Sequence, residues 1–150
     1  MSKRLSISHE GIRFIEACEG FSAQAYPDHG GTAIGYGSHV APGSFPDGIT
    51  RAQAYAMLLA DLAPFEEMVR QRVPADCTQQ QFDALCSFAY NVKGQPGALE
   101  MLLSHGWENV PAQLPRWCHT VVDGVEVEDA GLKDRRLKEA MMFRDKRWAS

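Results

Sequence analysis

Two acidic residues near the start of the chain have the types and the spacing of an acid–base pair. Glu19 ends a helix-like run and is followed by Gly20, and Asp28 lies in the turn after Tyr26-Pro27. This separation is enough for a helix end and a facing hairpin turn to hold both side chains across one gap. Two carboxyl groups in unlike surroundings can divide proton donation and proton acceptance between them.

The run before Glu19 predicts an apolar setting for this carboxyl group. With Ser8 as the N-cap, Ile12, Ile15 and Glu19 fall on one helical face. Desolvation there, and the negative end of the helix dipole, favour the neutral acid that a proton donor requires. Asp28 lies in a polar turn and is expected to stay ionised. Taken singly, each residue is more typical of an ordinary helix end or turn.

The wider sequence resembles the phage-type lysozyme (endolysin) family, glycoside hydrolase family 24. The resemblance extends over nearly the whole chain in the order of the family's motifs. The matching segments are Glu19-Gly20, Tyr26, Asp28, Ile34-Gly35-Tyr36-Gly37, Gln81 to Leu85, Phe88 to Val92, Gly131-Leu132, Arg135-Arg136 and Glu139. An ordered series of this kind is more specific than any one motif.

The resemblance implies hydrolysis of the β-1,4 bond between N-acetylmuramic acid and N-acetylglucosamine in peptidoglycan, without a cofactor or a metal. Glu19 is then expected to protonate the leaving oxygen, while Asp28 orients or activates water or stabilises the oxocarbenium-like state. The resemblance also places Arg135 beside Glu19. Asn91 is expected either to line the cleft or simply to close its helix.

The water-positioning threonine of the family has a displaced counterpart in this chain. Its place directly before Ile34 is taken by Ala33, and Thr32 lies one residue earlier. Because side chains of a strand alternate between faces, the displacement turns Thr32 away from the cleft unless a bulge restores it. The family pattern nevertheless proposes Thr32 as the catalytic residue that positions water. His29, close by, is either a candidate for part of that role or an ordinary solvated turn residue.

The fold implied is a mostly helical α+β, lysozyme-like fold with two lobes in a single domain, residues 1–150. A small lobe with a β-hairpin is expected over about residues 1–50, a connecting helix over about 51–72 and a larger helical lobe over about 73–150.

Helix signals along the chain agree with this outline. Thr50 caps a long run in which Pro64 begins a further turn, and Thr78 with Gln81 forms a capping box before the most apolar helix, which ends near Asn91. Short helices are predicted over 98–104 and 107–119, and a small hairpin or loop over 121–129. Trp117 is predicted to be a core residue, and a last helix over 132–148 is predicted to direct Leu137, Met141 and Trp148 to the core.

Composition excludes several classes of protein. The chain is 45% hydrophobic and 23% charged with a formal net charge of −4, which argues against nucleic-acid binding. The basic residues between positions 133 and 147 are interpreted as a solvated helix face. The four cysteines have no metal-site spacing and are expected to be buried reduced thiols, Cys18 and Cys86 among them. Their even number leaves a disulfide after release open as the alternative.

The first residues, Met1 to Ser6, carry no apolar run that would serve as a signal peptide or membrane anchor. We therefore expect the protein to reside in the cytoplasm of the producing cell, without stable membrane insertion. It is expected to act on peptidoglycan in the periplasm after a holin or an injection apparatus releases it. We also expect a monomer. Three alternatives stay open: a lytic transglycosylase, a catalytically impaired peptidoglycan-binding module, and a secreted antibacterial effector.

Overall fold

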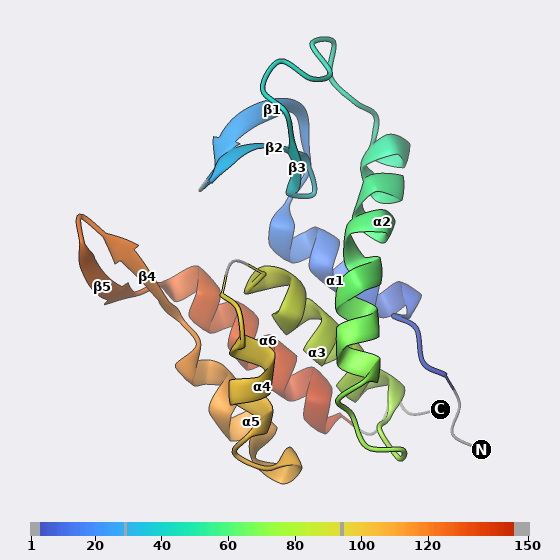
Figure 1. Ribbon diagram of the computed structural model, residues 1–150, viewed down its shortest axis with the longest axis vertical. Helices are drawn as coiled ribbons and strands as arrows, with labels where there is room; N and C mark the ends of the chain where they lie inside the picture. Colours follow the sequence, from blue (N-terminus) through green and yellow to red (C-terminus); the bar gives the residue numbers. More distant parts are fainter. Residues whose placement is uncertain (1–3, 29, 94, 146–150) are drawn as a thin grey trace.

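The computed structural model describes residues 4–28, 30–93 and 95–145, and Figure 1 labels their helices and strands. In chain order these are α1 (His9–Glu19), β1 (Ser22–Asp28), β2 (Gly31–Gly35), β3 (Ser38–Val40), α2 (Arg51–Arg70), α3 (Gln79–Asn91), α4 (Ala98–Leu103), α5 (Val110–Gln113), β4 (His119–Val122), β5 (Val125–Glu128) and α6 (Ala130–Arg144). The predicted mostly helical α+β fold is confirmed.

Helix α1 begins and ends where its sequence signals predict. The Ser8 side chain accepts a hydrogen bond from the Gly11 amide, and Gly20 closes the helix with φ 74°. Ile12 and Ile15 are buried on the inner face. The chain then turns at Gly20 into a three-stranded antiparallel sheet with the order β1-β2-β3, so that Glu19 lies between the first helix and the sheet.

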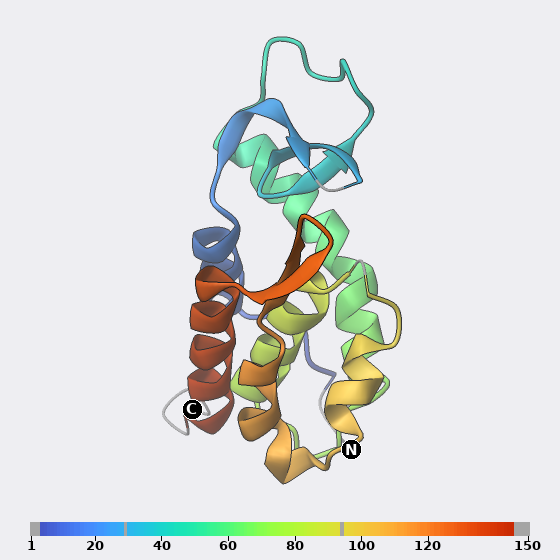
Figure 2. The ribbon, with the colours of Figure 1, turned by 90° about the vertical axis from the view of Figure 1, so that its left-hand side faces the viewer.

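The helical part of the molecule is built around α3, which packs against α1, α2 and α6. The predicted capping box at its start is present, with the Thr78 side chain bonded to the Gln81 amide and the Gln81 side chain bonded back to the Thr78 amide. Every residue from Phe82 to Tyr90 is buried, which confirms α3 as the core helix. Figures 1 and 2 show α4, α5 and α6 gathered around it.

Helix α2 connects the sheet with the helical part. It is continuous from Arg51 to Arg70 with Pro64 inside it, and Figure 1 shows it extending from beside the sheet to the far end of the helices. One hydrophobic cluster joins α1, β2 and the first half of α2, and a larger one fills the helical part. Ile7 and Phe65 pack against both clusters.

The predicted helix over 107–119 is wrong in its continuity. Only short helical pieces form there, a 3-10 turn at Trp107–Asn109, α5, and a second turn at Leu114–Arg116. Pro111 and Pro115 each remove an amide donor that a continuous helix needs. His119 instead begins β4, and the β4–β5 hairpin turns at Asp123-Gly124, where both residues have positive φ. Trp117 packs against the larger cluster, as predicted.

The predicted inner face of the last helix is also wrong. Leu137 and Met141 are exposed, at 45% and 67%, whereas Arg135, Arg136 and Glu139 are buried. Leu137 and Met141 are four residues apart and share the outer face, because the buried ionic groups occupy the inner one. The interpretation of this whole basic segment as solvated therefore fails at Arg135 and Arg136. Helix α6 ends at Arg144, and Trp148 lies outside the described residues.

The cysteines are free thiols throughout the described part of the chain, and Cys86 and Cys118 are buried as expected. Cys18 is exposed, which corrects the prediction that it lies on the apolar face of α1. Burial raises the pKa of the half-buried Cys77 thiol to about 12. Among the helices described here, none is long and apolar enough to cross a membrane.

Candidate active site

Glu19 is held at the end of α1 by a direct ion pair with α6. Arg135 Nη1 donates a hydrogen bond to Glu19 Oε2 over 2.5 Å. The Glu19 side chain is 18% exposed and that of Arg135 only 7%. Arg135 thus lies where the sequence resemblance places it, and it fixes the orientation of the Glu19 carboxyl group.

Arg135 is itself held by a buried network between α3 and α6. Its guanidinium donates to the Ser87 carbonyl oxygen over 3.2 Å and to Glu139 Oε2 over 3.4 Å, and the Ser87 hydroxyl donates to Glu139 Oε2 over 2.5 Å. Burial alone would lower the pKa of Arg135, but the charges of Glu139 and Glu19 raise it above its ordinary value. The arginine therefore remains a fixed cation at the site.

The second oxygen of Glu19, Oε1, lies towards the turn between β2 and β3. A β-carbon added to Gly37 would be 3.1 Å from Glu19 Oε1 and 3.7 Å from the Tyr90 hydroxyl oxygen. Gly37 also has φ 92°, which disfavours any other residue. The Ile-Gly-x-Gly motif thus has a direct physical role, because its last glycine lets the backbone approach the candidate acid.

Lys93, just after the end of α3, adds a cation to this region. Its Nζ lies 3.9 Å from the Tyr90 ring centroid and 3.5 Å from the Gly37 carbonyl oxygen. Packing around the ammonium group lowers the pKa of Lys93, and the charges of Glu19, Asp61 and Asp28 oppose that shift.

Asp28 lies at the end of β1 on a defined face of the sheet. The pairing of Asp28 with Gly31, of Tyr26 with Ala33 and of Ala33 with His39 places these side chains on one face. Burial raises the pKa of Tyr26, and the charges of Asp28 and Glu19 raise it further. The charges of Asp28 and Glu19 therefore both act on Tyr26.

Thr32 lies on the opposite face of the sheet from Asp28. It pairs with Pro27 on one side and Val40 on the other, and Ile34, two residues later, is buried in the cluster that includes α2. The irregular pairing of β1 with β2 falls between Ser22 and Tyr26, so it does not shift Thr32 relative to Asp28. The bulge that would bring Thr32 to the Asp28 face is not at this position.

The remaining predicted residues have separate outcomes. Asn91 is the last residue of α3, and its side-chain oxygen accepts a hydrogen bond from the buried Arg136 guanidinium. His29 lies outside the described residues. Among the residues described, no group of three or more His, Cys, Asp and Glu side chains is arranged to hold a metal ion.

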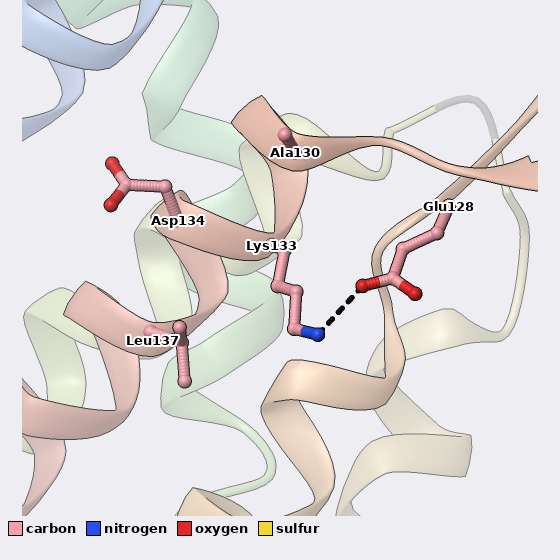
Figure 3. A pocket seen from close by; sticks show the side chains of 5 residues that line it. All are labelled: Glu128, Ala130, Lys133, Asp134 and Leu137. Carbon is pink, nitrogen blue, oxygen red and sulfur yellow. Dashed lines mark ion pairs between the residues drawn. The ribbon is translucent and has the colours of Figure 1, made fainter.

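A surface pocket on the other side of α6 does not involve these residues. It is lined by Glu128, Ala130, Lys133, Asp134 and Leu137, and Figure 3 shows the Lys133–Glu128 ion pair at its edge. The two charged groups are 2.7 Å apart and half exposed. The pocket therefore lies at the base of the β4–β5 hairpin, apart from Glu19 and Asp28.

The structure thus places a helix-end glutamate, paired with a buried arginine, near a Gly-rich sheet that carries an aspartate. The sequence matches the family model described as phage lysozyme over residues 16–139. The chain belongs to the phage lysozyme family. This match includes both candidate acids and the α3–α6 network that holds Arg135.

Relatives of the chain share part of its sequence and its fold. The endolysin of Bacillus phage PZA is 36% identical over 146 residues, an alignment that covers 93% of this chain and 55% of that protein. The endolysin from Escherichia coli O157:H7 phage FAHEc1 has a TM-score of 0.82 and 30% identity, covering 97% of this chain and 98% of that one. The muramidase domain of SpmX from Asticaccaulis excentricus has a TM-score of 0.76 and 30% identity, covering 93% and 98%. The chain thus spans about half the length of the Bacillus phage relative and nearly all of the two solved structures.

Three residues at this candidate site were not predicted from the sequence. Tyr90 and Lys93 belong to the site because their side chains contact the backbone of the β2–β3 turn, and the sequence does not indicate that contact. His39 contacts Asp28, with 3.4 Å between its Nε2 and the Asp28 Oδ2. The register of β3 places His39 on the face that carries Asp28. That register depends on the lengths of the turns, which must be known before His39 can be assigned to a face.

Proposed function

We propose that this phage lysozyme is a muramidase that hydrolyses the β-1,4 bond between N-acetylmuramic acid and N-acetylglucosamine in peptidoglycan and so lyses bacterial cells. The observation that carries the proposal is the carboxyl group of Glu19, which is held at the end of α1 by the buried Arg135. Membership of the phage lysozyme family supports the same activity.

The chemistry requires one proton donor and one carboxylate on the water side. Glu19 donates its proton to the glycosidic oxygen as the bond from that oxygen to the anomeric carbon breaks. Water adds to the anomeric carbon, and Asp28 orients it and accepts its proton or stabilises the positive charge that develops on the sugar. Arg135 acts on Glu19 by holding one of its oxygens. No cofactor enters this scheme.

Glu19→Gln is the experiment for this function. The amide keeps the shape of the side chain but cannot donate the proton, so we expect a loss of about 10²-fold or more in the rate of peptidoglycan cleavage. Mass spectrometry of purified peptidoglycan after digestion should show reducing muramic-acid ends with the unaltered protein. A folded Glu19→Gln protein of near-normal activity would exclude Glu19 as the acid.

The position of Thr32 favours one second candidate, a lytic transglycosylase. Such an enzyme needs the acid but no residue that positions water, and Thr32 lies on the sheet face opposite Asp28. The same mass spectra distinguish the two, because a transglycosylase leaves 1,6-anhydro ends. If the protein binds peptidoglycan without any cleavage, it is a binding module instead.

The endolysin relatives support an action of the protein on the cell wall. We infer that the protein works as a monomer and reaches the periplasm from the cytoplasm of the producing cell through a holin. Delivery by an injection apparatus, as a secreted antibacterial effector, is the alternative.

A further inference from the structure

We propose that His39 is a positioning residue for Asp28, whose imidazole fixes the carboxylate that directs the attacking water. The inference rests on the proposed hydrolysis and assigns a residue that the sequence pattern did not supply. It starts from the contact between His39 Nε2 and Asp28 Oδ2, which are 3.4 Å apart.

The register of the sheet makes this contact specific. Asp28 is on β1 and His39 on β3, with β2 between them, so their backbones are about 9 to 10 Å apart at the usual strand spacing. On the shared face, the β2 residues beneath the two side chains are Gly31 and Ala33. Gly31 has no side chain and Ala33 has a single methyl group, so neither blocks the contact between the aspartate and the imidazole across the middle strand.

Neither Thr32 nor Ala33 brings a hydrogen-bonding side chain to the face of the sheet where His39 contacts Asp28. Thr32, the residue that the family pattern offers for holding water, lies on the other face with Ile34. Ala33 brings no polar atom to the Asp28 face. The imidazole therefore supplies a hydrogen-bonding group to Asp28 on the side of the middle strand where a family threonine would stand.

The exposure of the pair fits a site that handles water. The side chains of His39 and Asp28 are 51% and 36% exposed, so solvent reaches both. With its proton on Nε2, the imidazole donates to the carboxylate and restricts its rotation. A fixed carboxylate holds water at one distance from the anomeric carbon, and small displacements of a reacting group cost large factors in rate.

The test measures kcat and KM on purified peptidoglycan fragments for His39→Phe, His39→Gln and His39→Ala. His39→Phe keeps a ring of similar size but cannot donate, and we expect kcat to fall about 10- to 100-fold with little change in KM. His39→Gln retains a donor and should recover most of kcat. Added imidazole should restore part of the activity of His39→Ala, because the site is open to solvent.

The matched control is His119→Phe on the β4–β5 hairpin. His119 is also a strand histidine beside a carboxylate, with 4.0 Å between its Nδ1 and Glu126 Oε1 and a side chain that is 44% exposed. This variant should keep the kcat of the unaltered protein.

Three outcomes overturn the role. They are an unchanged kcat in a folded His39→Phe protein, a rise in KM alone, and equal losses in His39→Phe and His39→Gln. An unaltered protein that cleaves no peptidoglycan contradicts the proposed function instead, and Glu19→Gln run beside the His39 variants keeps the two failures apart.

Discussion

At the scale of single residues, the candidate site separates into a rigid half and an open half. Glu19 is fixed by Arg135, whose other contacts are with Ser87 and Glu139 in the buried network. Asp28 is at the end of a strand and contacts the half-exposed His39. This division suits the two tasks, because a proton donor must meet one oxygen of the substrate whereas the other carboxylate must also admit water.

The ranking of Asp28→Ala against Thr32→Ala tests the face assignment. Because Thr32 is on the face opposite Asp28, we expect Asp28→Ala to lose far more lytic activity, measured as the fall in turbidity of a cell-wall suspension. Ala33→Thr is the companion variant, since it returns a hydroxyl group to the Asp28 face. The reverse ranking would mean that a bulge brings Thr32 to the site in solution.

Much of the site was predictable because its residues carry local signals. Glu19 ends a capped helix and Asp28 is the last residue of β1, just before a Gly-rich turn, so local pattern and resemblance singled out both as candidates. The contact of Arg135 with Glu19 was implied by the resemblance alone. His39 and Lys93 were missed because their contacts depend on strand register and on the end of α3, which a local pattern does not determine.

At the scale of elements, caps and turns were predictable and the inner face of α6 was not. Ser8, Thr50 and Thr78 all cap helices as their spacing indicates. The inner face of helix α6 carries charged residues, whereas hydrophobic periodicity predicts that charged residues lie on the outer face. The physical reason is the network of Arg135, Arg136 and Glu139, which satisfies those buried charges mutually.

Glu139→Gln tests whether that network stabilises the packing of α6. Glu139 is fully buried and pairs with both arginines, so its removal leaves buried positive charge uncompensated. We expect a loss of about 3–5 kcal/mol in the free energy of unfolding, measured with urea. Asp134→Asn, which breaks the exposed pair with Lys138 on the same helix, should change the midpoint little. Equal effects of the two would show that the buried network adds no stability.

Asp83 gives a pH-dependent contact between α3 and the start of α1. Ser8 donates to its carboxylate through both the amide and the hydroxyl group, and Gln79 donates over 2.9 Å. Burial nevertheless raises the pKa of Asp83 above its ordinary value of 3.8, and the Ser8 and Gln79 hydrogen bonds only partly offset it. The folded state therefore holds this proton more tightly than the unfolded state does.

The sign of the effect follows from that difference. The contribution of Asp83 to stability is complete below the unfolded pKa and is lost as the pH rises through the higher folded pKa. We expect the stability of Asp83→Asn, compared with the unaltered protein by urea unfolding, to improve as the pH rises from about 4 and to level off once the pH exceeds the folded pKa of Asp83. A difference that is constant with pH would show that the two pKa values are the same.

At the scale of the whole molecule, helix α2 is expected to make the sheet and the helical part unfold together. Its residues Ala54, Leu58 and Leu62 belong to the smaller hydrophobic cluster and Val69 to the larger one. Phe65, between them, packs against both. Figures 1 and 2 show that this helix extends along both parts. The single-domain organisation stays a prediction until cooperativity is measured.

The tryptophans make that measurement possible, because all three follow position 100 in the chain, at Trp107, Trp117 and Trp148. Trp107 and Trp117 pack against the larger cluster, so their fluorescence reports on the helical part. Leu58→Ala removes a fully buried side chain from the smaller cluster, and Leu102→Ala is the matched change in the larger one. Each should lower the free energy of unfolding by about 2–5 kcal/mol.

If the chain unfolds as one unit, Leu58→Ala shifts the urea midpoint of tryptophan fluorescence as much as that of far-ultraviolet circular dichroism. The fluorescence midpoint would shift because α2 contributes side chains to both clusters and because Ile7 and Phe65 pack against both. An unchanged fluorescence midpoint, with circular dichroism separating into two transitions, would instead mean that the parts fold independently. Glu19 and Asp28 would then be held on a unit that opens before the α3–α6 network does, because Leu58 shares its cluster with Ile15 of α1 and Ile34 of β2.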